Sequence, residues 1–281
     1  MFYKIIDYVF MFFLFSAVGW TVECTYRSLG ERRIINSGFL HGPMCPIYGV
    51  GCLVIDTLLV PIAAPIGKRI FIVLILGMIL ADIVEYTTSF LMEKLFNARW
   101  WDYSNNFLNL HGRICFKHTI YWAIFTFFYV YIIAPIYRYA LTFISQQVRT
   151  IAVFVILAVF LVDLTLTVKA AADINKMMKK LQNLKKTIKE KGESLLDTAG
   201  EKYEVILSSG DKINEWKNEI NRQYLDTITQ YEQLESSSKA TKRLLTIYST
   251  IKKSADDSIV EIESLWNDFR SFFSDTDNEM M

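Results

Sequence analysis

Histidine and cysteine are scarce in this sequence, with three and four copies among 281 residues. The chain also lacks the phosphate-binding pattern G-x-x-x-x-G-K-[ST] and the spacings that mark zinc proteases and Ser-His-Asp hydrolases. We therefore predict that it is not an enzyme and binds no cofactor. His41 and Cys45, and likewise His111 and Cys115, are four residues apart. Structural zinc sites have closer cysteine pairs, so we expect packing here rather than metal binding.

An excess of charge of one sign is also missing. The 30 basic and 29 acidic side chains leave a formal net charge of +1, which argues against a nucleic-acid partner. All five prolines lie before residue 136, whereas charged residues crowd the part after residue 170. No single water-soluble core would be built from such a chain. We predict a transmembrane domain over residues 1–170 and a cytoplasmic helical or coiled-coil tail over 171–281.

Long apolar runs dominate the first part. As helices rising about 1.5 Å per residue, each would reach roughly 27–35 Å, the thickness of a hydrocarbon core. The runs show no strand-like alternation, and helices satisfy their own backbone in lipid. The sequence therefore predicts an all-α polytopic membrane protein with the lipid bilayer as a partner. Its five expected spans are 5–22, 47–66, 70–92, 119–137 and 150–168.

The first run is not expected to be a removable signal peptide, because Trp20 and Glu23 stand where small cleavage-site residues would be. Basic residues are concentrated in the loops 24–45 and 93–118 and in the stretch after the fifth span. The positive-inside rule then places these segments in the cytoplasm and the N-terminus outside the cell membrane. Disulfides are not expected at that reducing face.

Two segments of the transmembrane domain resemble each other. Val22-Glu23-Cys24-Thr25 closes the first expected span, and Val84-Glu85-Tyr86-Thr87 lies near the end of the third. The pattern L-H-G-x-x-C follows in both cases, at residues 40–45 and 110–115. This order predicts an internal duplication, with two helix pairs as parallel repeats. Coincidence, helped by shared constraints on helix ends, is the alternative.

Acidic residues inside apolar spans are the main functional signal. A charge at the bilayer centre costs about 2.5–3.5 kcal/mol on insertion scales, so it normally faces protein or water. One interpretation is a polar pocket open to the cytoplasm, and the other is structural ion pairing between helices. For Asp56 and Asp163 we favour structural pairing. The candidate pocket or ion-pair residues are Glu23, Asp82, Glu85, Arg33, Asn36, Asp102 and Arg113.

The first loop, residues 32–46, combines helix breakers such as Gly38 and Pro43 with apolar residues such as Phe39 and Leu40. Such a segment is expected to re-enter the membrane or lie at its interface, buried in protein or lining a cavity. In the second loop, Trp100 and Trp101 suit either the headgroup zone or ligand stacking.

Both loops resemble a bacterial family described as putative ABC transporter permease, or putative ABC-transporter type IV. The first resembling stretch is Asn36-x-Gly38-Phe39-Leu40-x-Gly42-Pro43-x-Cys45-Pro46-Ile47-Tyr48-Gly49, preceded by Gly19-Trp20 and Glu23. The second comprises Glu85-Tyr86-x-Thr88-Ser89, Glu93, Trp100-Trp101-Asp102-Tyr103-Ser104 and Gly112-Arg113-Ile114-Cys115. The resemblance spans roughly residues 5–140, so the fifth span and the tail are expected to lie outside it. It implies a permease that needs a separate ATPase subunit.

The tail shows helical periodicity. Ile174, Met177, Leu181, Leu184 and Ile188 follow a heptad spacing. Further apolar stripes follow at 213–231 and 248–273, and breaks are expected at Gly192, Gly200, 208–210 and 236–238. The fifth span is expected to continue into the first tail helix. Pairing within a bundle is the favoured interpretation, and homo-oligomerisation or partner helices are the alternatives.

Three functions remain in competition. The leading one is a transport-related membrane protein, permease-like or accessory, in which Glu23 and Glu85 bind a cationic group or relay protons and Arg33 and Arg113 orient them. The second is a membrane-anchored scaffold that recruits a partner through the tail. The third and least supported is an intramembrane enzyme using His41, His111 or Asp102.

Overall fold

The computed structural model describes residues 1–32, 34–63, 69–96, 99–201 and 210–237, and single positions between 241 and 267. The chain forms two compact units, Met1–Lys169 and Ala170–Met281. The described residues are helical except for loops and one two-stranded hairpin. The predicted all-α polytopic membrane architecture is thereby confirmed.

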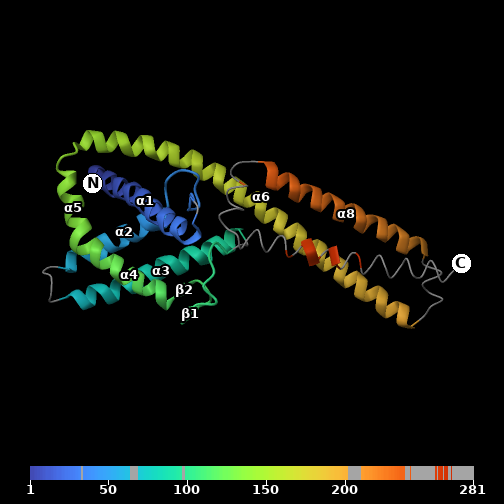
Figure 1. Ribbon diagram of the computed structural model, residues 1–281. Coiled ribbons are helices and arrows are strands. Elements are labelled where there is room, and N and C mark those ends of the chain that lie inside the picture. Colours follow the sequence, from blue (N-terminus) through green and yellow to red (C-terminus); the bar gives the residue numbers. More distant parts are fainter. Residues whose placement is uncertain are drawn as a thin grey trace. The chain divides into compact units, whose positions relative to one another are not determined.

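Antiparallel helices build the first unit. α1 (Phe2–Glu31) lies beside α2 (Pro46–Leu58), and α3 (Ile70–Phe96) lies beside α4 (Phe116–Phe128), as Figure 1 shows. A 3₁₀ turn η1 (Val60–Ile62) follows α2, and the hairpin β1 (Asn109–Leu110) and β2 (Ile114–Cys115) precedes α4. A π-helical segment η2 (Tyr129–Ile133) and α5 (Ala134–Leu141) continue α4. The unit ends with the first part of α6 (Gln146–Glu201).

Within the described part of the chain, four helical stretches are long and apolar enough to cross a membrane. They are Phe2–Glu31, Ile70–Phe96, Phe116–Leu141 and Gln146–Glu190. In the most apolar segment of each stretch, at most 33% of the residues are buried inside the protein, and in α6 only 11% are. These side chains therefore face outward, as lipid-exposed surfaces do.

The structure describes only part of the second expected span, residues 47–66. The described helical stretch covers Pro46–Ile62, about 25 Å at 1.5 Å per residue. Pro61, which lacks a backbone N–H, lies in the 3₁₀ turn that follows the end of α2. Residues 64–66 of the expected span lie outside the described residues.

The fourth span is irregular in its middle. Pro135 lies at the start of α5 and cannot donate a hydrogen bond to the preceding turn. The helix widens into the π segment η2 just before it. Tyr129, at the start of η2, is fully buried in the core with Phe15, Leu59 and Val73.

Close helix contacts require glycine at Gly49 and Gly77, among other positions. A Cβ on Gly49 of α2 would collide with Ser16 and with the backbone oxygen of Phe12 on α1. A Cβ on Gly77 of α3 would collide with Thr126 on α4. Small residues of this kind let membrane helices approach closely.

The second unit contains the rest of α6 and α8 (Gly210–Ser237). The whole predicted seam is buried in it: Ile174, Met177, Leu181, Leu184 and Ile188. The continuation of the fifth span into the tail is confirmed, since α6 is unbroken from Gln146 to Glu201. Much of the two later apolar stripes lies outside the described residues and side chains.

The break expected at Gly192 is wrong, because this glycine lies inside α6. The break expected at Gly200 lies one residue before Glu201, the last residue of α6 that the structure describes. A helical glycine costs only about 1 kcal/mol relative to alanine, which neighbouring helical turns can offset. The expected breaks at 208–210 and 236–238 coincide with the start of α8 at Gly210 and its end at Ser237.

Candidate functional site

The two long loops meet at one end of the first unit. The ring of Phe39 in the first loop lies 5.8 Å from that of Phe96 at the end of α3, and 5.1 Å from that of Trp100 in the second loop. Leu40 is completely buried and Trp100 nearly so. Ile35 and Leu40 of the first loop are thus buried in protein, whereas Ile34 is exposed. This burial explains part of a loop composition that water would not favour.

Glu85 lies on α3 below this junction and is only 5% exposed. Its Oε1 accepts a hydrogen bond from the Tyr103 hydroxyl at 3.1 Å. Its Oε2 accepts one from the Trp122 indole N–H on α4 at 2.8 Å. Both donors are neutral, so the buried carboxylate is solvated by protein without being neutralised.

Glu23, near the end of α1, is half-buried and also accepts hydrogen bonds from neutral donors. It accepts a hydrogen bond from the Tyr48 hydroxyl on α2 at 2.6 Å and a longer one from Ser37 at 3.4 Å. The Tyr48 and Trp122 rings lie 6.0 Å apart, which links the partners of the two carboxylates. Burial, followed by the negative charges of Glu85 and then Glu23, raises the pKa of the Tyr103 phenol above its ordinary value.

Arg113, one of the two expected cations, does not reach these carboxylates. Arg113 forms its ion pair with Glu93 at 2.6 Å, and Arg33 lies outside the described residues. Among the residues that the structure describes, no ion pair involves Glu23 or Glu85. A buried carboxylate without a counter-charge is costly unless it takes up a proton or a cation.

Asp82 extends the acidic face of α3 by one turn. Its Oδ2 accepts a hydrogen bond from Thr119 at 2.8 Å, whereas its buried Oδ1 has no hydrogen-bond partner among the described residues. A cavity of about 20 Å³ lies nearby between α2, α3 and α4. Tyr48, Glu85 and Trp122 line it together with apolar side chains, and it has room for roughly one water molecule.

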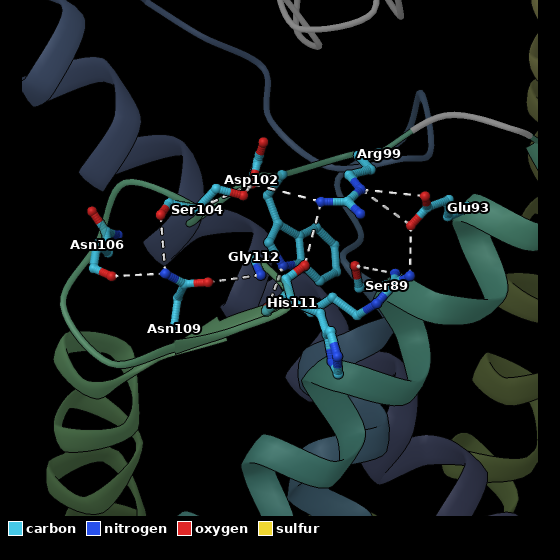
Figure 2. A network of polar contacts seen from close by, with 11 residues as sticks. Ser89, Glu93, Arg99, Asp102, Ser104, Asn106, Asn109, His111 and Gly112 are labelled. Carbon is cyan, nitrogen blue, oxygen red and sulfur yellow. Dashed lines mark hydrogen bonds and ion pairs between the residues drawn. The ribbon is translucent and has the colours of Figure 1, made fainter.

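A second polar network supports the other face of the second loop, as Figure 2 shows. Arg113 is only 9% exposed, pairs with Glu93 and donates to Ser89 at 3.2 Å. Arg99 contacts the same Glu93 carboxylate at 3.3 Å and donates to the backbone oxygen of His111 at 3.3 Å. Two arginines on one half-exposed carboxylate fix the loop to α3.

Asp102 and Asn36 belong to loop architecture rather than to the carboxylate cluster. Asp102 accepts hydrogen bonds from the backbone N–H and hydroxyl of Ser104, which lower the pKa of its carboxyl group. Gly112 beside it has a φ of +68°, and a Cβ there would collide with Asp102. Asn36 accepts a hydrogen bond from the Trp20 indole at 2.8 Å and donates one to the backbone oxygen of His41 at 3.2 Å.

The remaining acids of the spans make structural contacts. Asp56 pairs with Arg138 at 2.8 Å and accepts a hydrogen bond from Tyr129 at 3.1 Å. Asp163 on α6 accepts backbone hydrogen bonds from His41 and Gly42 at 3.0 and 2.8 Å.

Neither loop histidine has a metal-like environment. His41 contacts Thr167 and Asp163, and His111 contacts the Tyr86 hydroxyl at 3.1 Å. Over the described ranges, no group of three or more potential ligands could hold a metal ion.

Four residues of the site were not among the predicted candidates: Glu93, Trp122 and the hydroxyl partners Tyr48 and Tyr103. Of these, Tyr48, Glu93 and Tyr103 lie in the stretches that carry the family resemblance. Part of the signal was present, because Glu85, Ser89 and Glu93 are four residues apart and so share one face of α3. The contacts of Tyr103 and Trp122 with Glu85 join distant segments and leave no local pattern.

Neither the curated proteins nor the solved structures contain a match to this chain. The sequence model of the family described as putative ABC-transporter type IV matches residues 10–168. The match includes the fifth span, so the expectation that the resemblance ends near residue 140 is wrong. It covers both loops, both carboxylates and most of the first unit. The chain therefore belongs to the putative ABC-transporter type IV family and is a membrane protein with a transport-related role.

Proposed function

We propose that this chain is a permease-like or accessory membrane subunit whose carboxylates Glu23 and Glu85 form a proton-binding pocket facing the cytoplasm. The observation on which the proposal rests is the environment of Glu85. It is almost fully buried, accepts hydrogen bonds from two neutral donors and lines a cavity. An acid in a membrane protein with such surroundings is a typical proton-relay residue.

The size of the cavity favours protons over larger cations. With room for roughly one water molecule, the space beside Glu85 and Tyr48 would not admit an organic cation without rearrangement. A bound water could link the cavity-lining groups and exchange a proton with Glu85. We therefore favour a proton over an organic cation as the ligand.

The pocket would form between two duplicated helix pairs. Cys45 caps α2 and Cys115 caps α4, both with extended backbones, and both are the last residue of an L-H-G-x-x-C pattern. Glu23 and Glu85 each accept a hydrogen bond from an aromatic side chain of the helix that follows. These equivalences support the duplication, and binding sites of repeat-built membrane proteins often lie where the repeats meet.

A separate ATPase would supply the energy if the chain is a permease, because the sequence has no phosphate-binding loop. The full chain purified in mild detergent should then bring down an ATPase subunit, identified by mass spectrometry. Absence of any ATPase from such preparations would contradict the permease role.

The pocket is tested with Glu85→Gln and Glu23→Gln. We expect either change to lower substrate-dependent ATP hydrolysis of the reconstituted complex about tenfold or more, because the neutral amide cannot release a proton. The infrared band of a protonated carboxyl group should also weaken in Glu85→Gln. Glu190→Gln, an exposed change in the tail, is the matched control. Wild-type hydrolysis and an unchanged infrared band in both pocket variants would overturn the proposal.

The scaffold remains the second candidate, and α6 favours it. The helix extends unbroken far beyond any length needed to cross a membrane and buries its apolar seam within the second unit. A chain shortened at about Ala171 that loses function, while both glutamine variants stay active, would identify a scaffold. We also propose that the chain is not an enzyme, and turnover of a lipid or soluble substrate by the pure protein would contradict this.

A further inference from the structure

Asp163 holds the first loop against α6. Its carboxylate accepts the backbone N–H groups of His41 at 3.0 Å and Gly42 at 2.8 Å. The His41 ring lies 3.4 Å from it, and the buried Thr167 hydroxyl one turn further contacts both the ring and the carboxylate. Hydrogen bonds to an ionised acceptor are the stronger kind, so these contacts hold the loop firmly to α6.

The same loop reaches Glu23 at its other end. Ser37 donates its hydroxyl to Glu23 and its backbone N–H to Cys24 Sγ at 3.1 Å. Asn36 bridges the two ends of the loop, since it donates to the His41 backbone oxygen. A short chain of hydrogen bonds thus runs from Asp163 through His41 and Asn36–Ser37 to Glu23.

α6 connects this chain of hydrogen bonds to the C-terminal tail. The helix that bears Asp163 and Thr167 continues without interruption past Lys169 into the second unit, where Leu181 and its seam neighbours are buried. A continuous helix transmits a shift or rotation along its axis. Any event that repacks the tail seam can therefore act on Asp163.

We propose that Asp163 is a positioning residue that couples the C-terminal tail to the Glu23 side of the pocket, by clamping the backbone of His41 and Gly42 to α6. Repacking of the tail moves α6, releases or tightens the clamp, and so shifts Ser37 relative to Glu23. The regulatory meaning of this coupling rests on the proposed function, but the coupling itself is mechanical and can be measured without transport.

Cys24 reports the position of the loop, because Ser37 hydrogen-bonds its thiol and the other three cysteines are buried. In Asp163→Asn, the amide N–H₂ opposes one of the two backbone N–H groups, so the loop should open more often. We expect alkylation of Cys24 by a maleimide, followed by peptide mass spectrometry of the full chain, to become about tenfold faster. Asp173→Asn, an exposed change further along α6, should leave the rate unchanged.

A second variant guards against misfolding of the first. A Cβ on Gly42 would lie 3.1 Å from the Asp163 carboxylate oxygen. Gly42→Ala should therefore loosen the same contact while the charge of Asp163 is retained. Proteolysis patterns and size-exclusion profiles report on the fold. Unchanged Cys24 alkylation in folded Asp163→Asn and Gly42→Ala would overturn the clamp.

The link to the tail is tested with Leu181→Asp, which opens the seam, and Gln182→Asp, its exposed neighbour. We expect Leu181→Asp alone to change Cys24 alkylation, and the change to disappear when four flexible residues are inserted after Lys169. A seam opened by Leu181→Asp without any change at Cys24 would overturn the coupling. Because this readout needs neither proton binding nor an ATPase, its failure is distinguishable from that of the pocket.

Discussion

At the scale of single residues, Arg113 shows how the second loop compensates a buried charge. Its guanidinium group pairs with Glu93, donates to Ser89 and lies 5.6 and 5.5 Å from the ring centres of Tyr86 and Phe90. The aromatic faces and the carboxylate together compensate a cation that is 91% buried. Among the described residues, Glu85 has no such compensation, because both of its hydrogen-bond donors are neutral. This difference separates a structural charge from a candidate functional one.

Arg113→Gln should therefore destabilise the first unit. Breaking a buried ion pair costs roughly 3–5 kcal/mol, but Glu93 is 32% exposed and keeps Arg99, so we expect about 2 kcal/mol. Thermal unfolding in detergent, followed by tryptophan fluorescence, measures the loss. Lys117→Gln, an exposed cation near the Tyr121 ring, should shift the midpoint little. Equal midpoints for both variants would show that the pair contributes nothing.

At the scale of elements, the sequence predicted which segments are helical, but it predicted the helix ends less well. The apolar runs indicated α1, α3, α4–α5 and the membrane part of α6 because lipid exposure leaves a long uninterrupted signal. Gly192 does not end α6, and α2 ends at Leu58, before the end of its apolar run. Helix ends depend on local hydrogen bonds and on tertiary packing, neither of which hydropathy records.

The close contact between α3 and α4 predicts how a larger residue at Gly77 changes the stability of the helix pair. Gly77→Ala places a methyl group against Thr126, and overpacking of this kind costs about 1–3 kcal/mol. Gly30→Ala on α1 meets no atom within 4 Å, so it should instead stabilise its helix by up to about 1 kcal/mol. Opposite shifts of the two unfolding midpoints are expected. A stabilising Gly77→Ala would mean that α3 and α4 are further apart than described.

At the scale of the whole molecule, the sequence indicated that the carboxylates matter without showing what surrounds them. Glu23, Asp82 and Glu85 were found because a charge in an apolar run is rare. Their hydrogen-bond partners come from α2, α4 and the second loop. Contacts between segments so far apart in the sequence produce no local residue pattern from which they could be predicted. The pairing of Arg113 with Glu93 instead of Glu85 has the same origin.

The last prediction concerns the path of the chain through the membrane, which depends on the short helix α2. If Pro46–Ile62 crosses the bilayer, the two loops lie on one face, as the contact between Phe39 and Trp100 requires. Its length of about 25 Å is a few ångströms short of a typical core, which local thinning of the bilayer can accommodate. If α2 does not cross, α3 runs the other way and the second loop is on the opposite face.

Cysteines at Ile34 and Phe107, both exposed positions in the loops, and at Gln147 near the start of α6 distinguish these cases. We expect a membrane-impermeant maleimide to label Ile34→Cys and Phe107→Cys only in inverted vesicles, because the positive-inside rule places both loops in the cytoplasm. Gln147→Cys should react in intact cells. The unmodified chain gives the background from Cys24. Labelling of the two loop positions from opposite sides would contradict the fold, and labelling of both from outside would reverse the orientation and remove the cytoplasmic pocket.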